Sequence, residues 1–144
     1  MRKNHLRTLL TGLAVATAAA FVPAGAQAAG TSSVRAEAPA PDGFLYAWEH
    51  AHAGGAHCRW NQDNGNWAGC RNKISDVWNN GFPGRLQDVR LFWATGMNGS
   101  WVCLHQGESI PDLNAAGTVF TAPGRGQGQR VNDNVSSHDW VDAC

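Results

Sequence analysis

Residues 132–137 have the sequence NDNVSS, which places five polar side chains in six positions close to the end of the chain. Asn, Asp and Ser side chains, together with backbone carbonyls of a turn, are the oxygen ligands that a hard cation such as Ca²⁺ prefers. The segment therefore predicts a calcium site. The alternative is that these side chains hydrogen-bond the backbone of the turn and hold no ion.

A second group of potential ligands consists of His50, His52 and His57. Residues two apart on a strand share a face, and imidazole suits zinc or copper. Because a Gly-Gly pair separates these histidines, we favour exposed loop histidines over a metal site. Two further histidines, His105 and His138, have no partner at a recognisable spacing.

Motifs of catalysis are missing from the sequence. It contains no G-x-S-x-G nucleophile motif, no H-E-x-x-H zinc motif and no pair of carboxylates that spacing places together. We therefore predict that the protein is not an enzyme.

The N-terminus has the pattern of a cleaved export signal. A basic head with Arg2, Lys3 and Arg7 precedes an apolar stretch from residue 9 to 22, and small residues follow at 26–28. A membrane anchor would need about 20 apolar residues, and this stretch is shorter. We predict a signal peptide over residues 1–28, cleavage after Ala28, and a secreted, extracellular protein. No later segment is apolar enough to span a membrane, so a membrane partner is not expected.

The four cysteines, Cys58, Cys70, Cys103 and Cys144, all follow the export signal. An even number of cysteines in an exported chain indicates two disulfides, for which three pairings exist. We favour Cys58 with Cys70 and Cys103 with Cys144. A cysteine metal site would be expected to show C-x-x-C spacing, which the sequence lacks.

Composition and charge exclude several classes of protein. The whole chain has 11 Lys+Arg and 11 Asp+Glu, and the first 28 residues hold three basic and no acidic ones, which leaves 8 against 11, a net charge of −3. A basic nucleic-acid clamp is therefore excluded. With 15% charged residues, 17 Gly and 7 Trp, the chain resembles neither a disordered polyelectrolyte nor a helical bundle.

The elements that must position these residues are short strands. Residues 29–42 lack aromatic side chains and end in alternating Ala and Pro, which predicts a flexible N-terminal arm. The folded domain is predicted over residues 43–144. Within it the spacing W-x5-G-x3-C occurs twice, beginning at Trp48 and at Trp93. This repetition predicts two all-β units, repeat 1 at about 43–80 and repeat 2 at about 88–144, that pack together as a sandwich.

These features resemble the microbial βγ-crystallin superfamily and, within it, the actinobacterial secreted proteins labelled peptidase inhibitor family I36. Residues 48–55, WEHAHAGG, are similar to the aromatic, acid and Gly-Gly hairpin of a Greek-key motif. Residues 132–137 match the superfamily's calcium pattern N/D-N/D-x-x-S/T-S. The resemblance covers about residues 43–144 and implies an all-β, βγ-crystallin-like sandwich of two four-stranded Greek-key motifs.

The resemblance also implies how calcium would be held, because each site in the superfamily is shared between the two motifs. In the first motif Arg71 stands at the leading Asn/Asp position and Asp76 at the last Ser. A guanidinium would repel the ion, so at most one calcium site is expected. Its ligands would come from both motifs: Asn132, Asp133, Ser136, Asn72 and Ser75.

The seven tryptophans divide into two groups. Four of them, Trp48, Trp78, Trp93 and Trp140, fall at matching places in the two repeats and are predicted to form core layers. The other three, Trp60, Trp67 and Trp101, are candidates for an exposed aromatic patch on which sugar rings could stack.

For function, the resemblance implies a secreted, non-catalytic binding protein that inhibits an extracellular protease with a rigid loop. The long segment between Cys103 and Asn132 is the predicted loop, and Ile110, Val119 and Phe120 are its partner-binding residues. Val119 and Phe120 would fill a hydrophobic subsite of a thermolysin-like enzyme. The alternative is that this segment crosses between strands and Phe120 lies in the core.

Three other functions remain open from the sequence. The protein could be an adaptor that joins a secreted assembly, such as a toxin complex, through the arm at residues 29–42. It could be a structural module stabilised by calcium. Small secreted proteins of this kind also include antimicrobial and killer toxins.

Overall fold

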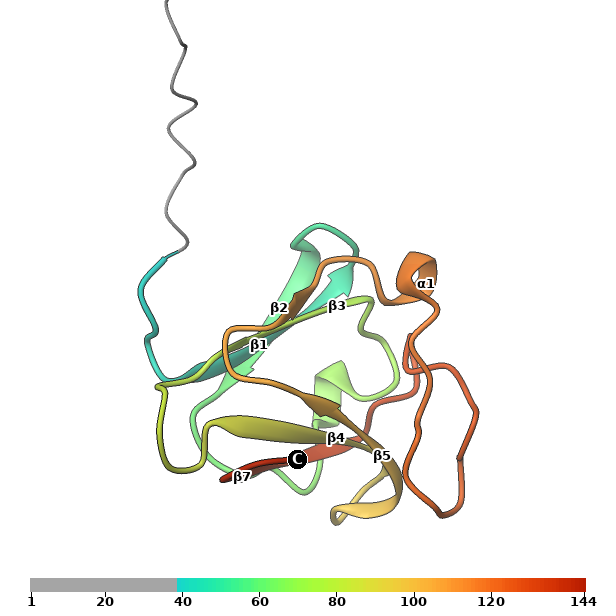
Figure 1. The fold of residues 1–144 in the computed structure, drawn as a ribbon. Helices are drawn as coiled ribbons and strands as arrows, with labels where there is room; N and C mark the ends of the chain where they lie inside the picture. The colour runs from blue at the N-terminus through green and yellow to red at the C-terminus, as the bar shows by residue number, and fades with distance from the viewer. Residues whose placement is uncertain (1–38) are drawn as a thin grey trace, which may run out of the picture. The chain divides into compact units, whose positions relative to one another are not determined.

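The computed structural model describes residues 39–144 (Figure 1). The predicted signal peptide and residues 29–38 of the predicted arm lie outside the described residues. The described part contains seven strands: β1 (Phe44–His50), β2 (Gly54–Trp60), β3 (Asp76–Asn80), β4 (Asp88–Ala94), β5 (Asn98–Leu104), β6 (Ser109–Ile110) and β7 (Ser137–Val141). Its helices are one 3-10 turn, η1 (Ala68–Cys70), and one short helix, α1 (Leu113–Ala116). Neither has the length and apolar character needed to cross a membrane.

Alternating side chains explain why β1 forms a strand with one buried face. Leu45 and Ala47 are fully buried, whereas Phe44, Tyr46 and Trp48 lie on the opposite face and are half-buried. Successive side chains of a strand point to opposite faces, so this sequence fits a sheet that covers a core on one side.

The strands form two antiparallel sheets, with orders β2-β1-β3-β6 and β5-β4-β7. Strand β6 belongs to the second repeat but pairs with β3 of the first, through Val77 with Ile110 and Trp78 with Ser109. In return, Asn64 of the first repeat forms an isolated bridge with His138 in β7. This exchange joins the repeats as two interlocked Greek keys, and the all-β fold predicted from the sequence is confirmed.

The first Greek key lacks a full third strand. Asn64 is followed by Gly65 and Asn66, and its side-chain oxygen accepts the backbone N–H of Asn66 at 2.8 Å. Asn and Gly favour turns over strands, and this local bond turns the chain away from β7 after one bridge. The resemblance implied four strands in each motif, and in the first repeat one of them is reduced to the single bridge between Asn64 and His138.

The repeated spacing of Trp, Gly and Cys is one residue out of register with the true structural repeat. In the first sheet Trp48 pairs with Asp76, and the corresponding pair in the second sheet is Phe92 with Ser137. Trp48 is therefore equivalent to Phe92 and not to Trp93. The predicted equivalence of the two tryptophans was wrong, because a match in spacing does not fix which face of the strand a residue occupies.

The core lies between the two sheets. Leu45, Ala47 and Val77 from the first sheet and Val89 and Leu91 from the second belong to one buried cluster. Of the tryptophans, only Trp67 and Trp140 are buried, while the other five are half-buried. The prediction of core layers was therefore wrong for Trp48 and Trp78, whereas Trp93 is half-buried and packs against the core cluster.

The predicted sugar-binding patch is not formed. Trp67 is 2% exposed, and Trp60 stacks on it with ring centroids 4.4 Å apart. Trp101 is half-buried beneath the Arg90 guanidinium, 5.4 Å from its ring centroid. The three rings therefore present no common open face.

Both disulfides have the pairing that we favoured from the sequence. Cys58 in β2 is bonded to Cys70 at the end of η1, and Cys103 in β5 is bonded to the C-terminal Cys144. All four cysteines are used, so the described part has no free thiol.

A buried histidine links the two repeats in the core. The Trp67 indole N–H donates to Nδ1 of His138 at 2.7 Å, and Nε2 of His138 lies 3.0 Å from the carbonyl of Gln62. Nδ1 is an acceptor in this arrangement, so Nε2 carries the proton and the ring is neutral. Burial lowers the pKa of His138 to about 4.

We expect this histidine to make the domain lose stability in mild acid. The folded pKa of about 4 lies below the ordinary value of 6.5, so protons bind the unfolded chain more tightly. The neutral, buried His138 contributes about 3 kcal/mol to the free energy of unfolding. This contribution is fully present above pH 6.5 and is lost as the pH falls toward 4. Urea unfolding between pH 7.5 and 4 measures it.

The control is His138→Gln, which keeps one donor and one acceptor but does not titrate. This variant should be less stable at pH 7.5 and should lose the pH dependence between 6.5 and 4.5. Asp76 is present in both proteins, and burial raises the pKa of its carboxyl. Protonation of Asp76 therefore favours the folded state as the pH falls, which opposes the effect of His138. An equal pH dependence in both proteins would show that His138 is not responsible.

Candidate functional site

Two polar turns meet at one end of the sandwich, and they are the structural counterparts of each other. Asn72 precedes β3 and Asp133 precedes β7, and both have left-handed backbone conformations, with φ of 56° and 58°. Among residues other than glycine, Asn and Asp adopt this conformation most readily. The alignment of the two turns made from the sequence therefore agrees with the backbone.

One hollow beside these turns has a volume of about 260 Å³ and is lined by oxygen donors. Its donors include the carboxylates of Glu49 and Asp133 and the hydroxyl of Ser75, and Lys73 is the opposing charge. The remaining lining residues are His50 and Asn72. We call this the acidic hollow, and its donor set fits a hard cation.

A second hollow of about 280 Å³ lies on the other side of Asn72. It is lined by two arginines, Arg71 and Arg125, together with Ser136, Asn134 and Thr95. Within the described residues neither guanidinium forms an ion pair. Two positive charges make this basic hollow unsuitable for calcium, as the position of Arg71 in the sequence predicted.

The five predicted calcium ligands do not gather around one point. Asp133 and Ser75 line the acidic hollow, whereas Ser136 lines the basic one, where its hydroxyl donates to Oδ1 of Asn72 at 3.0 Å. The amide of Asn132 donates to Oδ2 of Asp133 at 2.8 Å. The expected single cluster is thus divided between two hollows, which share Asn72. Glu49, which the sequence analysis did not select, joins the acidic set.

The predicted partner-binding residues are mostly inside the molecule. Phe120 is 0% exposed and belongs to the core cluster, and Ile110 in β6 packs against that cluster. Val119 is half-buried and forms a bridge with Arg130. The alternative considered from the sequence, with Phe120 in the core, is therefore the one that the structure shows. Its side chain is not available for a protease subsite.

The exposed part of the same segment is the stretch of residues 121–129, which we call the 121–129 loop. It follows α1 in the chain (Figure 1). Its base is closed by two backbone bonds, from the Phe120 N–H to Gln129 O at 3.0 Å and from the Gly128 N–H to Phe120 O at 2.8 Å. Its middle is held to β5, because the Ser100 N–H donates to Arg125 O at 2.8 Å.

Trp93 supports this loop from below. Its indole N–H donates to the side chain of Gln129 at 2.8 Å, and the Arg125 guanidinium lies 4.9 Å from its ring centroid. A Cβ on Gly126 would lie 2.3 Å from Cγ of Trp93, so only glycine permits this close approach. The loop therefore has one well-defined shape while most of its side chains remain exposed.

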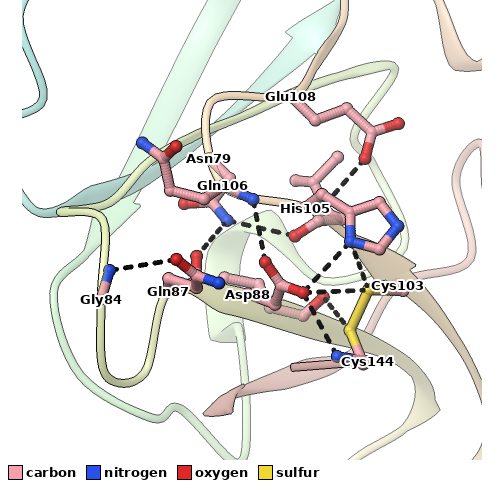
Figure 2. A network of polar contacts seen from close by, with 11 residues as sticks. Asn79, Gly84, Gln87, Asp88, Cys103, His105, Gln106, Glu108 and Cys144 are labelled. Carbon is pink, nitrogen blue, oxygen red and sulfur yellow. Dashed lines mark hydrogen bonds and ion pairs between the residues drawn. A yellow bond between two sulfur atoms is a disulfide. The ribbon is translucent and has the colours of Figure 1, made fainter. Parts of the chain in front are cut away.

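A buried carboxylate that the sequence analysis missed lies beside the second disulfide (Figure 2). Asp88, at the start of β4, is 5% exposed, and its Oδ2 is 3.1 Å from Nδ1 of His105. Its Oδ1 accepts the Gln106 N–H at 3.0 Å, and Oδ2 also accepts the Cys144 N–H at 3.2 Å. Burial raises the pKa of Asp88, but these hydrogen bonds outweigh it and hold the pKa below its usual value.

The donors that converge in the structure are not the histidines that the sequence analysis considered as metal ligands. His50, His52 and His57 are exposed and do not meet. Within residues 39–144, one group of His, Cys, Asp and Glu donors is close enough to surround an ion, and it consists of Asp88, Cys103 and His105. His105 lies two residues after Cys103 and so shares its side of the chain, which was the one available signal.

Two interlocked Greek keys, a shared core and a pair of equivalent turns define an all-β domain with the βγ-crystallin fold. One solved structure supports this assignment of the fold: a domain from work on the evolution of the eye-lens βγ-crystallin fold has 18% identity and a TM-score of 0.51, over 70% of this chain and 86% of the other. A βγ-crystallin from an archaeon has 17% identity and a TM-score of 0.49, over 68% of this chain and 96% of its own. One from Ciona intestinalis has 14% identity and a TM-score of 0.49, over 68% and 99%.

No family model and no curated protein matches the chain. The similarity to solved structures thus concerns the fold alone.

Proposed function

We propose that this chain is a secreted, non-catalytic binding protein that presents the 121–129 loop to an extracellular protease. The observation that supports the proposal is that this exposed loop is held in one shape by backbone bonds at its base and middle and by Trp93 beneath it. A loop ordered before binding loses little conformational entropy on association. Rigid loops of this kind are typical of inhibitors whose backbone moves little in the complex.

The charge on the loop indicates the class of protease. Arg125 is its one charged residue, and its side chain is exposed. Because Phe120 lies in the core, it cannot enter the hydrophobic subsite of a thermolysin-like enzyme. A trypsin-like serine protease has an acidic subsite that binds a cationic side chain, so it is the better match.

The test is inhibition of trypsin and thermolysin by residues 29–144, measured with a small peptide substrate. We expect trypsin to be inhibited and thermolysin to be unaffected. Replacing Arg125 by alanine should weaken inhibition at least about tenfold, which corresponds to about 1.4 kcal/mol. Gly126→Ala, which forces the loop away from Trp93, should weaken it without removing the charge.

Arg85 provides a matched control, because it is an exposed arginine outside the loop. Arg85→Ala should inhibit as the unmodified chain does. A chain that begins at Pro39 should also retain inhibition, whereas an adaptor that works through its arm would lose its partner. The proposal fails if neither protease is inhibited or if Arg125→Ala has no effect.

A second candidate function is a module stabilised by calcium, and the acidic hollow favours it. Glu49, Ser75 and Asp133 bring two carboxylates and a hydroxyl together from three separate segments of the chain. These residues would hold the ion, and the ion would link the β1–β2 hairpin to both polar turns.

We therefore expect calcium to raise the melting temperature. Free Ca²⁺ at a concentration 100 times its Kd would add about 2.7 kcal/mol to the free energy of unfolding. Calorimetry with and without Ca²⁺ at constant ionic strength measures the shift, and Asp133→Asn should abolish it. Asp142→Asn, an exposed aspartate away from the hollow, is the control and should keep it. Equal melting temperatures with and without the ion would exclude this role.

A further inference from the structure

The polar cluster at the second disulfide has the donor spacing of a tetrahedral metal site. Nδ1 of His105 lies 3.1 Å from Oδ2 of Asp88 and 3.5 Å from Sγ of Cys103, and the distance from Sγ to Oδ2 is 4.0 Å. A tetrahedral Zn²⁺ with nitrogen and oxygen at about 2.0 Å and sulfur at about 2.3 Å holds neighbouring donors roughly 3.3 to 3.8 Å apart. The three donors therefore need to move by only a fraction of an ångström.

The fourth donor is the other sulfur of the same disulfide. Cys144 is bonded to Cys103, and its backbone N–H donates to Asp88 (Figure 2). Its sulfur is not one of the three donors that lie within 4.8 Å of one another, so it would have to move to join them once the S–S bond is broken. A disulfide sulfur is a poor metal ligand, whereas a thiolate is a strong one. The oxidised protein thus has two of the four ligands available, and reduction would supply the other two.

We propose that reduction of the Cys103–Cys144 disulfide converts this cluster into a zinc site held by Asp88, Cys103, His105 and Cys144. A dithiol reductant supplies two electrons and two protons, the S–S bond breaks to give two thiols, and the dithiol becomes a disulfide. Binding of Zn²⁺ then releases both thiol protons to solvent. In the oxidised protein Nδ1–H of His105 donates to Asp88, so binding of zinc through Nδ1 requires the tautomer that carries the ring proton on Nε2 instead.

The local structure permits this change with little movement of the backbone. Cys144 is exposed, so its sulfur can move away from Cys103 once the bond is broken. Asp88 remains oriented, because the Gln106 N–H holds its other oxygen. Such hydrogen bonds to a ligand's second atom are usual around protein zinc sites.

The first disulfide is an internal control. Cys58 and Cys70 also become two thiols on reduction, but within the described residues no histidine or carboxylate joins them in a group close enough for an ion. The proposal therefore distinguishes one disulfide from the other in a single chain.

The test is zinc binding by the full mature chain, residues 29–144, before and after reduction with a water-soluble phosphine and desalting under nitrogen. Competition with a chromogenic chelator gives the affinity for zinc alone. We expect one Zn²⁺ per reduced chain and none per oxidised chain. His105→Ala removes a ligand whose side chain is 63% exposed, so the fold should persist, and the affinity should fall at least about tenfold.

Two double Cys→Ser variants show which disulfide supplies the sulfur ligands of the zinc ion. A chain with Cys58→Ser and Cys70→Ser should still bind zinc after reduction, and one with Cys103→Ser and Cys144→Ser should not. Cobalt in place of zinc should give the intense visible bands of a tetrahedral ion and the charge-transfer band of a thiolate. The proposal is overturned if the reduced chain binds no zinc, if His105→Ala binds as tightly, or if the cobalt spectrum is octahedral.

Discussion

Replacing Phe120 by alanine should destabilise the domain by about 3–5 kcal/mol, the cost of removing a large aromatic side chain from a close-packed core. Phe120 is 0% exposed and contacts the cluster that contains Leu45, Val77 and Leu104. Chemical unfolding in urea, monitored by tryptophan fluorescence, measures the change in free energy. This loss is a large fraction of the stability of a small domain.

Thr121→Ala is the matched control, because Thr121 is the next residue and its side chain is exposed. It should change the free energy of unfolding by less than about 0.5 kcal/mol. If Phe120→Ala cost no more than this control, Phe120 would be accessible in solution and the hydrophobic-subsite hypothesis would return. The two variants therefore decide between the two roles considered for Phe120 from the sequence.

Removal of the Cys103–Cys144 disulfide should cost about 4 kcal/mol, and removal of Cys58–Cys70 about 3 kcal/mol. The separations are 41 and 12 residues, and on the chain-entropy model a longer closed loop restricts the unfolded chain more strongly. Paired Cys→Ser variants compared by urea unfolding test both values. Because serine retains the backbone N–H that Asp88 accepts from residue 144, the comparison concerns mainly the covalent bond.

The informative result is which of the two disulfides contributes more to the free energy of unfolding. If the shorter loop proved to matter more, the entropy of the unfolded chain would not be the main term. The contribution of η1, which the first disulfide ties to β2, would then have to be larger than its three residues suggest.

The sequence predicted the parts of the fold that depend on local pattern. The repeated spacing predicted two all-β units, and the calcium pattern of the resembled superfamily aligned the turn at Asp133 with the turn at Asn72. The structure gives both residues a left-handed backbone, in agreement with that alignment. The favoured disulfide pairing was also confirmed. Each of these features is set by residues close in the chain or by a small number of alternatives.

The errors have a common physical cause. The Trp48 and Trp93 repeat was placed one residue out of register, and a shift of one residue on a strand exchanges the buried and exposed faces. Phe120 could be assigned to a loop or to the core, and only the packing of the neighbouring sheet decides between them. The Asp88 cluster joins residues 15 to 56 positions apart, and no local pattern encodes such contacts.

The exchange of β6 between the repeats has a consequence for how the protein is made. Synthesis from the N-terminus delivers β1, β2 and β3 first, but the edge of their sheet stays open until residues 109 and 110 have left the ribosome and reached β3. An open strand edge invites pairing with other chains. The last strand, β7, must arrive before Asn64 finds its partner, so neither half can be completed ahead of the other. The two repeats are therefore one cooperative folding unit, and a nascent chain remains unprotected until β7 has been made.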